Sequence, residues 1–303
     1  METTQCDVCQ SDTYELFIHN PTNYENYGQT YVNFDYMRCL KCYSLFSSKK
    51  ISEIDLGDLY PNDYLEADKV FNFSDIMTDL FYDLKSLIIY LKYRERKTLR
   101  ILDFGCGDAK FIKALAKYSK FQVVGFDPFI EREYKNNILF VNELKKLKAQ
   151  SEFDLVIVNH VLEHVVDVRE TLKFIFSLTS NNGKVVGVTP NPSHWLLNFS
   201  KKRWGYLHYP QHLRIMSKKG LKIVVEEIDN HKKKIELRIK NNLISTCWAY
   251  TAEHFYKDFI TMRYKGHWRY DKLVILSFFP VNLIEKLLTR NLSSFTFEIK
   301  LNA

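Results

Sequence analysis

Glycine and proline are scarce in this sequence. Its 303 residues include only 10 glycines and 7 prolines, whereas glycine makes up roughly 7% of an average protein. This scarcity excludes collagen-like and low-complexity chains, which are rich in both residues. Hydrophobic residues make up 46% of the chain and aromatic residues 15%, which excludes a disordered chain. Because glycines are few, their positions are informative, and five of them lie between residues 105 and 187.

A long apolar run and a signal peptide are also absent. The most apolar late segment, residues 273–288, is shorter than the ~20 residues of a membrane span, and it contains Pro280, Glu285 and Lys286. The first 30 residues show no basic start followed by an apolar run. We therefore expect a cytoplasmic protein without a transmembrane segment. Peripheral contact with a membrane is compatible with this expectation, and the sequence does not indicate an oligomeric state.

The charge of the chain does not single out a partner. Lys and Arg total 43 against 36 Asp and Glu, which gives a net charge of +7. This excess permits an anionic partner such as nucleic acid, a phosphorylated substrate or a lipid headgroup. A lysine-rich solvated surface would give the same total.

Four of the 6 cysteines form two CxxC pairs. Cys6 and Cys9 make the first pair, and Cys39 and Cys42 make the second, in an arrangement typical of a zinc ribbon. Each pair directs two thiolates at one metal ion, and two pairs complete a tetrahedron. Four thiolates leave no open coordination position, so we expect a structural Zn²⁺.

From residue 98 onward, short apolar runs alternate with helical patterns. The runs predict strands at 99–104, 122–126, 138–141, 153–158, 184–188, 235–239 and 295–301. This alternation is typical of an α/β fold with a doubly wound parallel sheet. We therefore divide the chain into a zinc module with a Tyr-rich connector (1–68), a linking amphipathic helix (69–97) and an α/β domain (98–303). A mostly helical insertion occupies about 241–292, before the last strand.

The turn after the first of these strands carries two of the scarce glycines. Asp103, Gly105, Cys106 and Gly107 lie there, where a doubly wound sheet binds nucleotides and glycines let the backbone approach a ligand. Asp127 ends the second strand, and a carboxylate at that point can accept hydrogen bonds from both hydroxyls of a ribose.

The sequence motif for binding a dinucleotide matches this loop poorly. That motif has a third glycine at the position where this chain has Lys110. The carboxylate of Asp103 would also repel a pyrophosphate, whereas it would attract an ammonium or a sulfonium. S-adenosyl-L-methionine carries both of these cations.

In three motifs the chain resembles the class I S-adenosylmethionine-dependent methyltransferases. LDFGCGDAKF (102–111), GFDP (125–128) and FDLVIVNHVLEHVVD (153–167) occur in the family's order. The resemblance implies a seven-stranded Rossmann-like sheet with an antiparallel last strand. It implies that Asp103, Gly105 and Gly107 line the methionine side of the cofactor and that Asp127 binds the ribose.

Two further cofactor contacts follow from the same resemblance. Asn142, or Glu143 beside it, would lie against the adenine, and Asn159 would lie near the methionine moiety.

Methyl transfer needs an aligned acceptor and, where required, a base. His160, Glu163 and His164 follow the fourth strand, at the sheet edge where acceptors bind. Histidine has an unperturbed pKa near 6.5, which suits removal of a proton from a hydroxyl or an acidic C–H. We predict His164 as general base, Glu163 as its orienting or relay group and His160 as an acceptor contact. These residues could instead hydrogen-bond the loop backbone and shape the pocket.

A second aromatic segment, residues 204–213, precedes the helix near 217–228. In the methyltransferases that this chain resembles, a similar segment lies over the acceptor pocket. His208, Tyr209 and His212 are therefore candidate substrate contacts. A packed aromatic loop is the alternative.

The N-terminal module extends the resemblance to bacterial methyltransferases that act on deoxysugars and polysaccharide precursors. Those enzymes often begin with a four-cysteine zinc module and a Tyr-rich connector, which Tyr60 and Tyr64 match. The resemblance implies a C- or O-methyltransferase in polysaccharide biosynthesis, acting on a nucleotide-linked sugar or a surface-glycan precursor. The helical insertion departs from that pattern and leaves the acceptor open.

Two other functions stay open at this point. An RNA methyltransferase would use the zinc ribbon and the basic surface to bind phosphates. However, no Asn/Asp-Pro-Pro-aromatic motif for adenine follows the fourth strand. A non-enzymatic zinc-ribbon binding module on an inactive methyltransferase fold is the third hypothesis, against which the intact loop and Asp127 argue.

Overall fold

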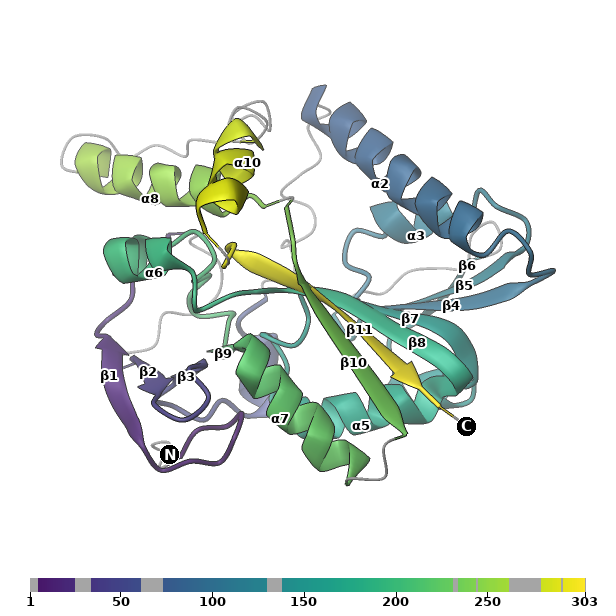
Figure 1. Ribbon diagram of the computed structural model, residues 1–303, viewed down its shortest axis with the longest axis horizontal. Coiled ribbons are helices and arrows are strands. Elements are labelled where there is room, and N and C mark those ends of the chain that lie inside the picture. The colour runs from purple at the N-terminus through teal and green to yellow at the C-terminus, as the bar shows by residue number, and fades with distance from the viewer. Residues whose placement is uncertain are drawn as a thin grey trace.

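The computed structural model describes residues 5–24, 34–60, 73–129, 138–230, 234–243, 245–261, 279–289 and 291–302. A seven-stranded sheet runs through the molecule (Figure 1), in the order β10-β11-β8-β7-β4-β5-β6. Its strands are β4 (Leu99–Phe104), β5 (Phe121–Phe126), β6 (Ile138–Val141), β7 (Phe153–Asn159), β8 (Thr179–Pro190), β10 (Ile235–Asn241) and β11 (Ser294–Leu301). The first five are parallel, and β11 lies antiparallel between β8 and β10. The predicted α/β fold with an antiparallel last strand is confirmed.

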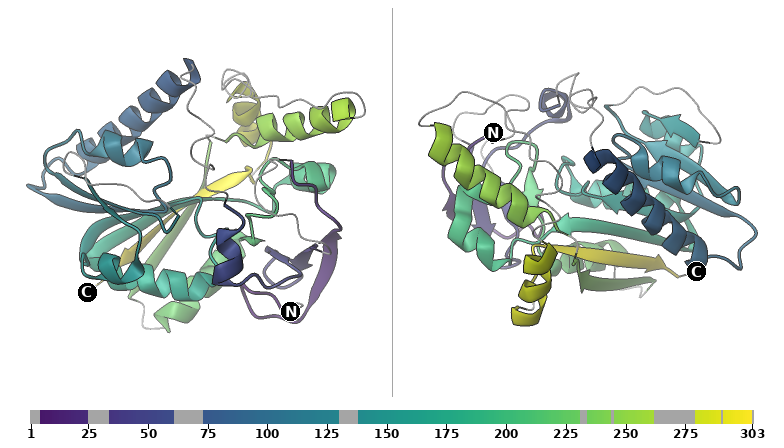
Figure 2. Two further views of the ribbon diagram at one scale, coloured as in Figure 1. Left: turned by 180° about the vertical axis from the view of Figure 1, so that it is seen from behind. Right: turned by 90° about the horizontal axis from the view of Figure 1, so that it is seen from above.

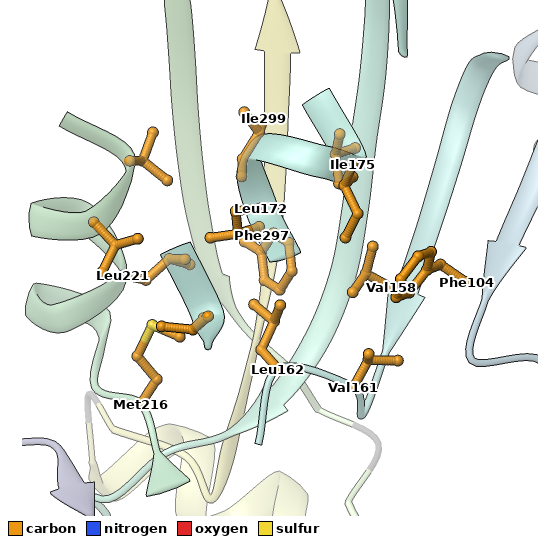
Figure 3. Close-up of a cluster of buried hydrophobic side chains, with 14 of the residues drawn as sticks. Phe104, Val158, Val161, Leu162, Leu172, Ile175, Met216, Leu221, Phe297 and Ile299 are labelled. Carbon is orange, nitrogen blue, oxygen red and sulfur yellow. The ribbon is translucent and has the colours of Figure 1, made fainter. Parts of the chain in front are cut away.

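Helices α5 (Val168–Leu178) and α7 (Lys218–Asp229) cover one face of this sheet (Figures 1 and 3). Each begins at a capping residue: the Asp167 side chain accepts hydrogen bonds from two backbone N–H groups, and the Ser217 side chain accepts one from Gly220. The caps satisfy donors that the first turn of a helix leaves without partners. The apolar stripes of both helices then pack against β11 and β7, and burial of these side chains stabilises the sheet.

The opposite face carries α2 (Phe73–Lys92) and the short helices α3 (Lys110–Leu115) and α4 (Leu144–Lys148). Tyr82 of α2 stacks on Phe111 with ring centroids 5.4 Å apart, and Tyr90 stacks on Tyr118 at 4.6 Å. The inner face of α2 is therefore largely aromatic. Leu80, Leu84, Leu87 and Leu91 lie on the opposite, outer face of α2, where they are between 39% and 59% exposed.

A second sheet has the order β1-β2-β3-β9. Three of its strands, β1 (Tyr14–Ile18), β2 (Tyr36–Cys39) and β3 (Leu45–Ser47), belong to the N-terminal region, where α1 (Glu53–Gly57) follows them. The fourth, β9 (Arg214–Ile215), comes from the α/β part of the chain. Buried Arg214 forms an ion pair with Asp7 at 2.7 Å and donates to the carbonyl of Val166. Strand pairing and this ion pair thus join the N-terminal sheet directly to the α/β part of the chain.

The predicted insertion contains α8 (Cys247–Thr261) and α10 (Phe279–Leu288). Seen from above (Figure 2), they lie next to α6 (Trp195–Ser200), which the turn η1 (Lys201–Arg203) follows. The buried Glu285 carboxylate joins these helices, because it accepts hydrogen bonds from the indole N–H groups of Trp195 and Trp248. Among the described residues, no helix combines the length and the apolar character needed to cross a bilayer.

Candidate cofactor and acceptor site

The loop between β4 and α3 has the geometry of a ligand-binding turn. Gly105 and Gly107 have φ values of +80° and +49°, a region that glycine adopts at little cost. A Cβ atom on Gly105 would lie 2.6 Å from a methyl carbon of Val161, so only glycine fits there. The amides of Gly105 and Cys106 donate to the carbonyl of Phe126 at 2.7 and 3.0 Å, which ties this loop to the end of β5.

Asp127 lies beside this loop, at the carboxyl end of β5. One carboxylate oxygen accepts a hydrogen bond from the amide of Gly107 at 3.1 Å, and the other accepts one from the amide of Phe129 at 3.1 Å. The Asp127 amide donates to the carbonyl of Val141, which brings Asn142 to the same edge of the sheet. Asn159 ends β7 two strands away in the sheet order. The structure therefore gathers all seven residues predicted to contact a cofactor at one edge of the sheet, which we call the cofactor edge.

Asp103 is a buried acid at this edge, and its pKa is raised to about 7. Burial is the main cause and the charges of Asp127 and Asp108 add to it, while the charge of Lys85 of α2 opposes it. A cationic ligand would favour the ionised form of this carboxyl group. Lys85 was not among the predicted site residues. Its Nζ lies 4.5 Å from the centre of the Phe111 ring, which places a second charge near the loop.

A group of five residues lies at the same edge beyond β7 and β8, and we call it the histidine cluster: His160, Glu163, His164, His208 and His212. Buried Glu163 is bonded through one oxygen to Nδ1 of His160 at 3.2 Å, and through the other to the Thr189 hydroxyl at 3.1 Å. Burial raises the pKa of Glu163, but the His160 hydrogen bond and the charges of His160 and His164 hold it below its ordinary value. Glu163 is therefore ionised in the cluster.

His164 occupies the centre of the cluster. Its Nδ1 lies 2.7 Å from the Tyr60 hydroxyl and 3.1 Å from the backbone carbonyl of Gln211. Burial lowers the pKa of His164 to about 4, against the opposite effect of Glu163, so the ring is neutral at pH 7. The ring of His212 lies 4.6 Å away, with its Nδ1 2.9 Å from the Tyr206 carbonyl. Burial also lowers the pKa of His212.

The other residues predicted to contact the acceptor do not all lie in the histidine cluster. The Tyr60 ring stacks on Phe129 at 4.7 Å and so connects the cofactor edge to the histidine cluster. His208 lies 5.0 Å from His212, between ring centres. Tyr209 is only 3% exposed and packs edge-on against Phe34, so its ring lies in the core of the N-terminal sheet and outside the cluster. Tyr64 lies outside the described residues.

The sequence analysis did not predict three groups that contact the cluster or Tyr60. Thr189 lies near the end of the fifth strand of the α/β part and Phe129 two residues after Asp127, so their positions alone could have suggested them. The Gln211 carbonyl is a backbone group, for which the sequence carries no signal.

Two groups of side chains could hold a metal ion. The sulfur atoms of Cys6 and Cys42 are 3.7 Å apart, those of Cys9 and Cys39 are 3.4 Å apart, and all four residues are buried. Such a set fits the tetrahedral thiolate coordination of a structural zinc ion. Glu163, His164 and His212 also offer ligand atoms within 4.8 Å of one another.

A family model for a methyltransferase domain matches residues 77–229, which is half of the chain. The chain belongs to this methyltransferase family. The match runs from α2 to the end of α7, and it includes both the cofactor edge and the histidine cluster. The protein is accordingly an S-adenosylmethionine-dependent methyltransferase.

Several solved structures are similar to this methyltransferase. The plantazolicin methyltransferase BpumL, in complex with a triazolic desmethylPZN analog and SAH, has 12% sequence identity and a TM-score of 0.47, with 80% of this chain and 95% of that chain covered. A cyclopropane-fatty-acyl-phospholipid synthase-like protein from Lactobacillus casei has 14% identity and a TM-score of 0.46, with coverage of 79% and 98%. No curated protein matches the sequence.

Proposed function

We propose that this methyltransferase moves the methyl group of S-adenosyl-L-methionine to an oxygen or an acidic carbon of a sugar, with His164 as general base. The observation that carries the proposal is the position of a neutral imidazole between Tyr60 and the Gln211 carbonyl, beside the cofactor edge. A neutral imidazole has a lone pair with which to accept a proton.

The cofactor would lie along the carboxyl edge of β4 to β7. Asp103 would face the ammonium group, with Gly105, Cys106 and Gly107 forming the wall beside the methionine. Asp127 would accept hydrogen bonds from the ribose, while Asn142 would lie near the adenine and Asn159 near the methionine. The raised pKa of Asp103 supports this placement, since a buried carboxyl group without a cation resists ionisation.

In the transfer step, His164 would donate through Nδ1 to the Gln211 carbonyl and accept the proton of the acceptor at Nε2. The acceptor atom attacks the methyl carbon, and the electron pair of the breaking bond stays on the sulfur, which becomes a neutral thioether. The ionised Glu163 would stabilise the imidazolium that forms. His160 holds one oxygen of Glu163 and thereby keeps its charge close to the ring.

A sugar acceptor is supported by the groups around His164. The stacked rings of Tyr60 and Phe129 offer an apolar face, and His160 and His208 offer polar contacts, with Tyr64 from the connector as a further candidate. The resemblance of the N-terminal region to sugar and polysaccharide-precursor methyltransferases points to the same class. We expect a structural Zn²⁺ on Cys6, Cys9, Cys39 and Cys42, and action on a nucleotide-linked or glycan precursor in the cytoplasm.

The test is incubation of the purified protein with methyl-labelled cofactor and, in separate reactions, a pool of nucleotide sugars or total RNA, with the labelled products identified by mass spectrometry. A labelled nucleotide sugar is expected from the native protein. His164→Asn should lower its formation on the order of 10²–10⁴-fold at unchanged cofactor affinity. The matched control His19→Asn changes an exposed histidine directly after β1. Label in RNA alone would replace the sugar with a nucleic-acid acceptor, and native turnover in His164→Asn would exclude this base.

A further inference from the structure

The histidine cluster contains a set of metal ligands as well as the proposed base. One ligand atom from each of Glu163, His164 and His212 lies within 4.8 Å of the other two. Two imidazoles and one carboxylate form a set that binds divalent transition metals in proteins, and three protein ligands leave a coordination position open. This set contains no thiolate, so its chemistry differs from that of the four-cysteine set.

Hydrogen bonds orient both imidazoles in the way that a metal site requires. Nδ1 of His164 lies 3.1 Å from the carbonyl of Gln211, and Nδ1 of His212 lies 2.9 Å from the carbonyl of Tyr206. Because a carbonyl only accepts hydrogen bonds, it favours a proton on Nδ1 and leaves the lone pair on Nε2. Histidines that bind metals almost always donate the other ring N–H to a carbonyl, a carboxylate or a water. In both rings Nε2 is therefore the nitrogen that can bind a metal.

Glu163 supplies the negative charge of the set. Its side chain is buried, with one oxygen bonded to His160 and the other to Thr189. A carboxylate has about four lone-pair positions, so these bonds leave others for a metal. A buried anion is stabilised by a cation next to it. The side chain of His160 is 47% exposed, so the cluster extends to the protein surface.

We propose that Glu163, His164 and His212 bind one divalent transition metal ion, through a carboxylate oxygen and the Nε2 atoms of the two rings. The site itself is independent of the acceptor. It competes with the proposed role of His164, because a metal ion and a proton use the same lone pair on Nε2. Protein with a metal ion in this site is therefore expected to lack His164 as general base.

Titration of the purified full chain with Co²⁺ tests the site. Three ligands with a single charge should hold a metal less tightly than four thiolates, so the purified protein should carry only the ion of the four-cysteine set. Added Co²⁺ should bind as one further equivalent per chain, measured by equilibrium dialysis and elemental analysis. Its absorption spectrum should lack the strong near-ultraviolet band of cobalt–thiolate bonds, which separates this site from the cysteines.

Two variants should remove the site. Glu163→Gln and His212→Asn should each raise the dissociation constant of Co²⁺ at least about tenfold, since the loss of an outer hydrogen-bond partner alone costs a metal site about 10–100-fold. Glutamine keeps the size of Glu163 without its charge, and asparagine keeps an N–H for the Tyr206 carbonyl without Nε2. His254→Asn is the matched control, because His254 is also buried, has Nδ1 3.0 Å from the Arg203 carbonyl and lies outside the cluster. Cofactor binding by each variant verifies its fold.

The same Co²⁺ affinity in Glu163→Gln as in the native protein, or binding by the cysteines alone, would overturn the proposal. Turnover gives a second readout: Co²⁺ should inhibit the native protein near its dissociation constant, and His212→Asn should need a higher concentration. An increase in turnover would also support the site but would reject His164 as the base. Because binding is measured without an acceptor, a protein that binds Co²⁺ and labels no sugar would keep the site and lose only the proposed acceptor.

Discussion

The hydroxyl of Tyr60 lies 2.7 Å from Nδ1 of His164, although 104 residues separate them in the chain. The same nitrogen lies 3.1 Å from the carbonyl of Gln211, which can only accept a hydrogen bond. The proton on Nδ1 can be donated to Gln211, or Nδ1 can instead accept from Tyr60. The pair therefore couples the tautomer of the proposed base to a residue of the N-terminal region.

Tyr60→Phe should test this coupling. Loss of the hydroxyl removes the donor that competes for Nδ1, while the Phe ring retains the stacking on Phe129. We expect turnover to fall by about tenfold, the effect of one lost hydrogen bond to a polar group, and the pH profile of turnover to shift. Tyr43→Phe, at an exposed tyrosine of the N-terminal region, is the control. A pH profile identical to that of the native protein would show that Tyr60 does not act through His164.

Asp127→Asn should weaken cofactor binding by at least about tenfold, because two charge-assisted hydrogen bonds to ribose hydroxyls are worth about 1.5–3 kcal/mol each. Asparagine keeps one acceptor oxygen for the backbone amides that Asp127 now holds. Isothermal titration with S-adenosylmethionine measures the change, and Asp12→Asn, at an exposed aspartate, is the control. Unchanged affinity would remove Asp127 from the cofactor site.

Cofactor affinity should increase between about pH 6 and pH 7.5. Burial raises the pKa of Asp103 to about 7, so the carboxylate that would attract the cationic cofactor forms over this interval.

The raised pKa of Asp103 has the opposite consequence for the stability of the fold, which should decrease over the same rise in pH. Asp103 binds its proton more tightly in the folded chain, so its contribution to stability is present at low pH and is lost as the pH rises through about 7. Asp103→Asn should flatten both dependences, in titration calorimetry and in urea unfolding. A pH dependence that survives in Asp103→Asn must come from another group.

Removal of the zinc ion proposed for the four-cysteine set should affect the histidine cluster as well as the N-terminal sheet. The carbonyl of Cys42 accepts a hydrogen bond from the Ser217 hydroxyl, and β3 pairs with β9, two residues after His212. We therefore expect one Zn²⁺ per chain by elemental analysis, and a chelator should lower both the melting temperature and turnover. Cys42→Ser should reproduce the effect, and Cys247→Ser, at a buried cysteine outside the set, should not alter the metal content. A metal-free native protein would reject the zinc site.

Local patterns were enough to place most of the sheet. The predicted bounds of β4 and β6 agree with the structure, because each is an apolar run that ends at polar or turn-forming residues. In contrast, the two-residue strand β9 carries no such pattern and forms because Arg214 is anchored by Asp7. The sequence also predicted Tyr209 as an acceptor contact beside His208, yet packing against Phe34 turns its ring into the N-terminal core.

By itself the sequence determined the position of the glycine loop after β4, of Asp127 at the end of β5 and of the four-cysteine set, since each depends on consecutive residues or on fixed spacing. Only the tertiary structure decided that Tyr60 meets His164 and that the pKa of His164 falls to about 4, because these depend on which distant segments bury one another. It also decided which face of α2 stays exposed. Periodicity identifies an apolar stripe, but aromatic stacking by Tyr82 and Tyr90 selects the opposite face for the core.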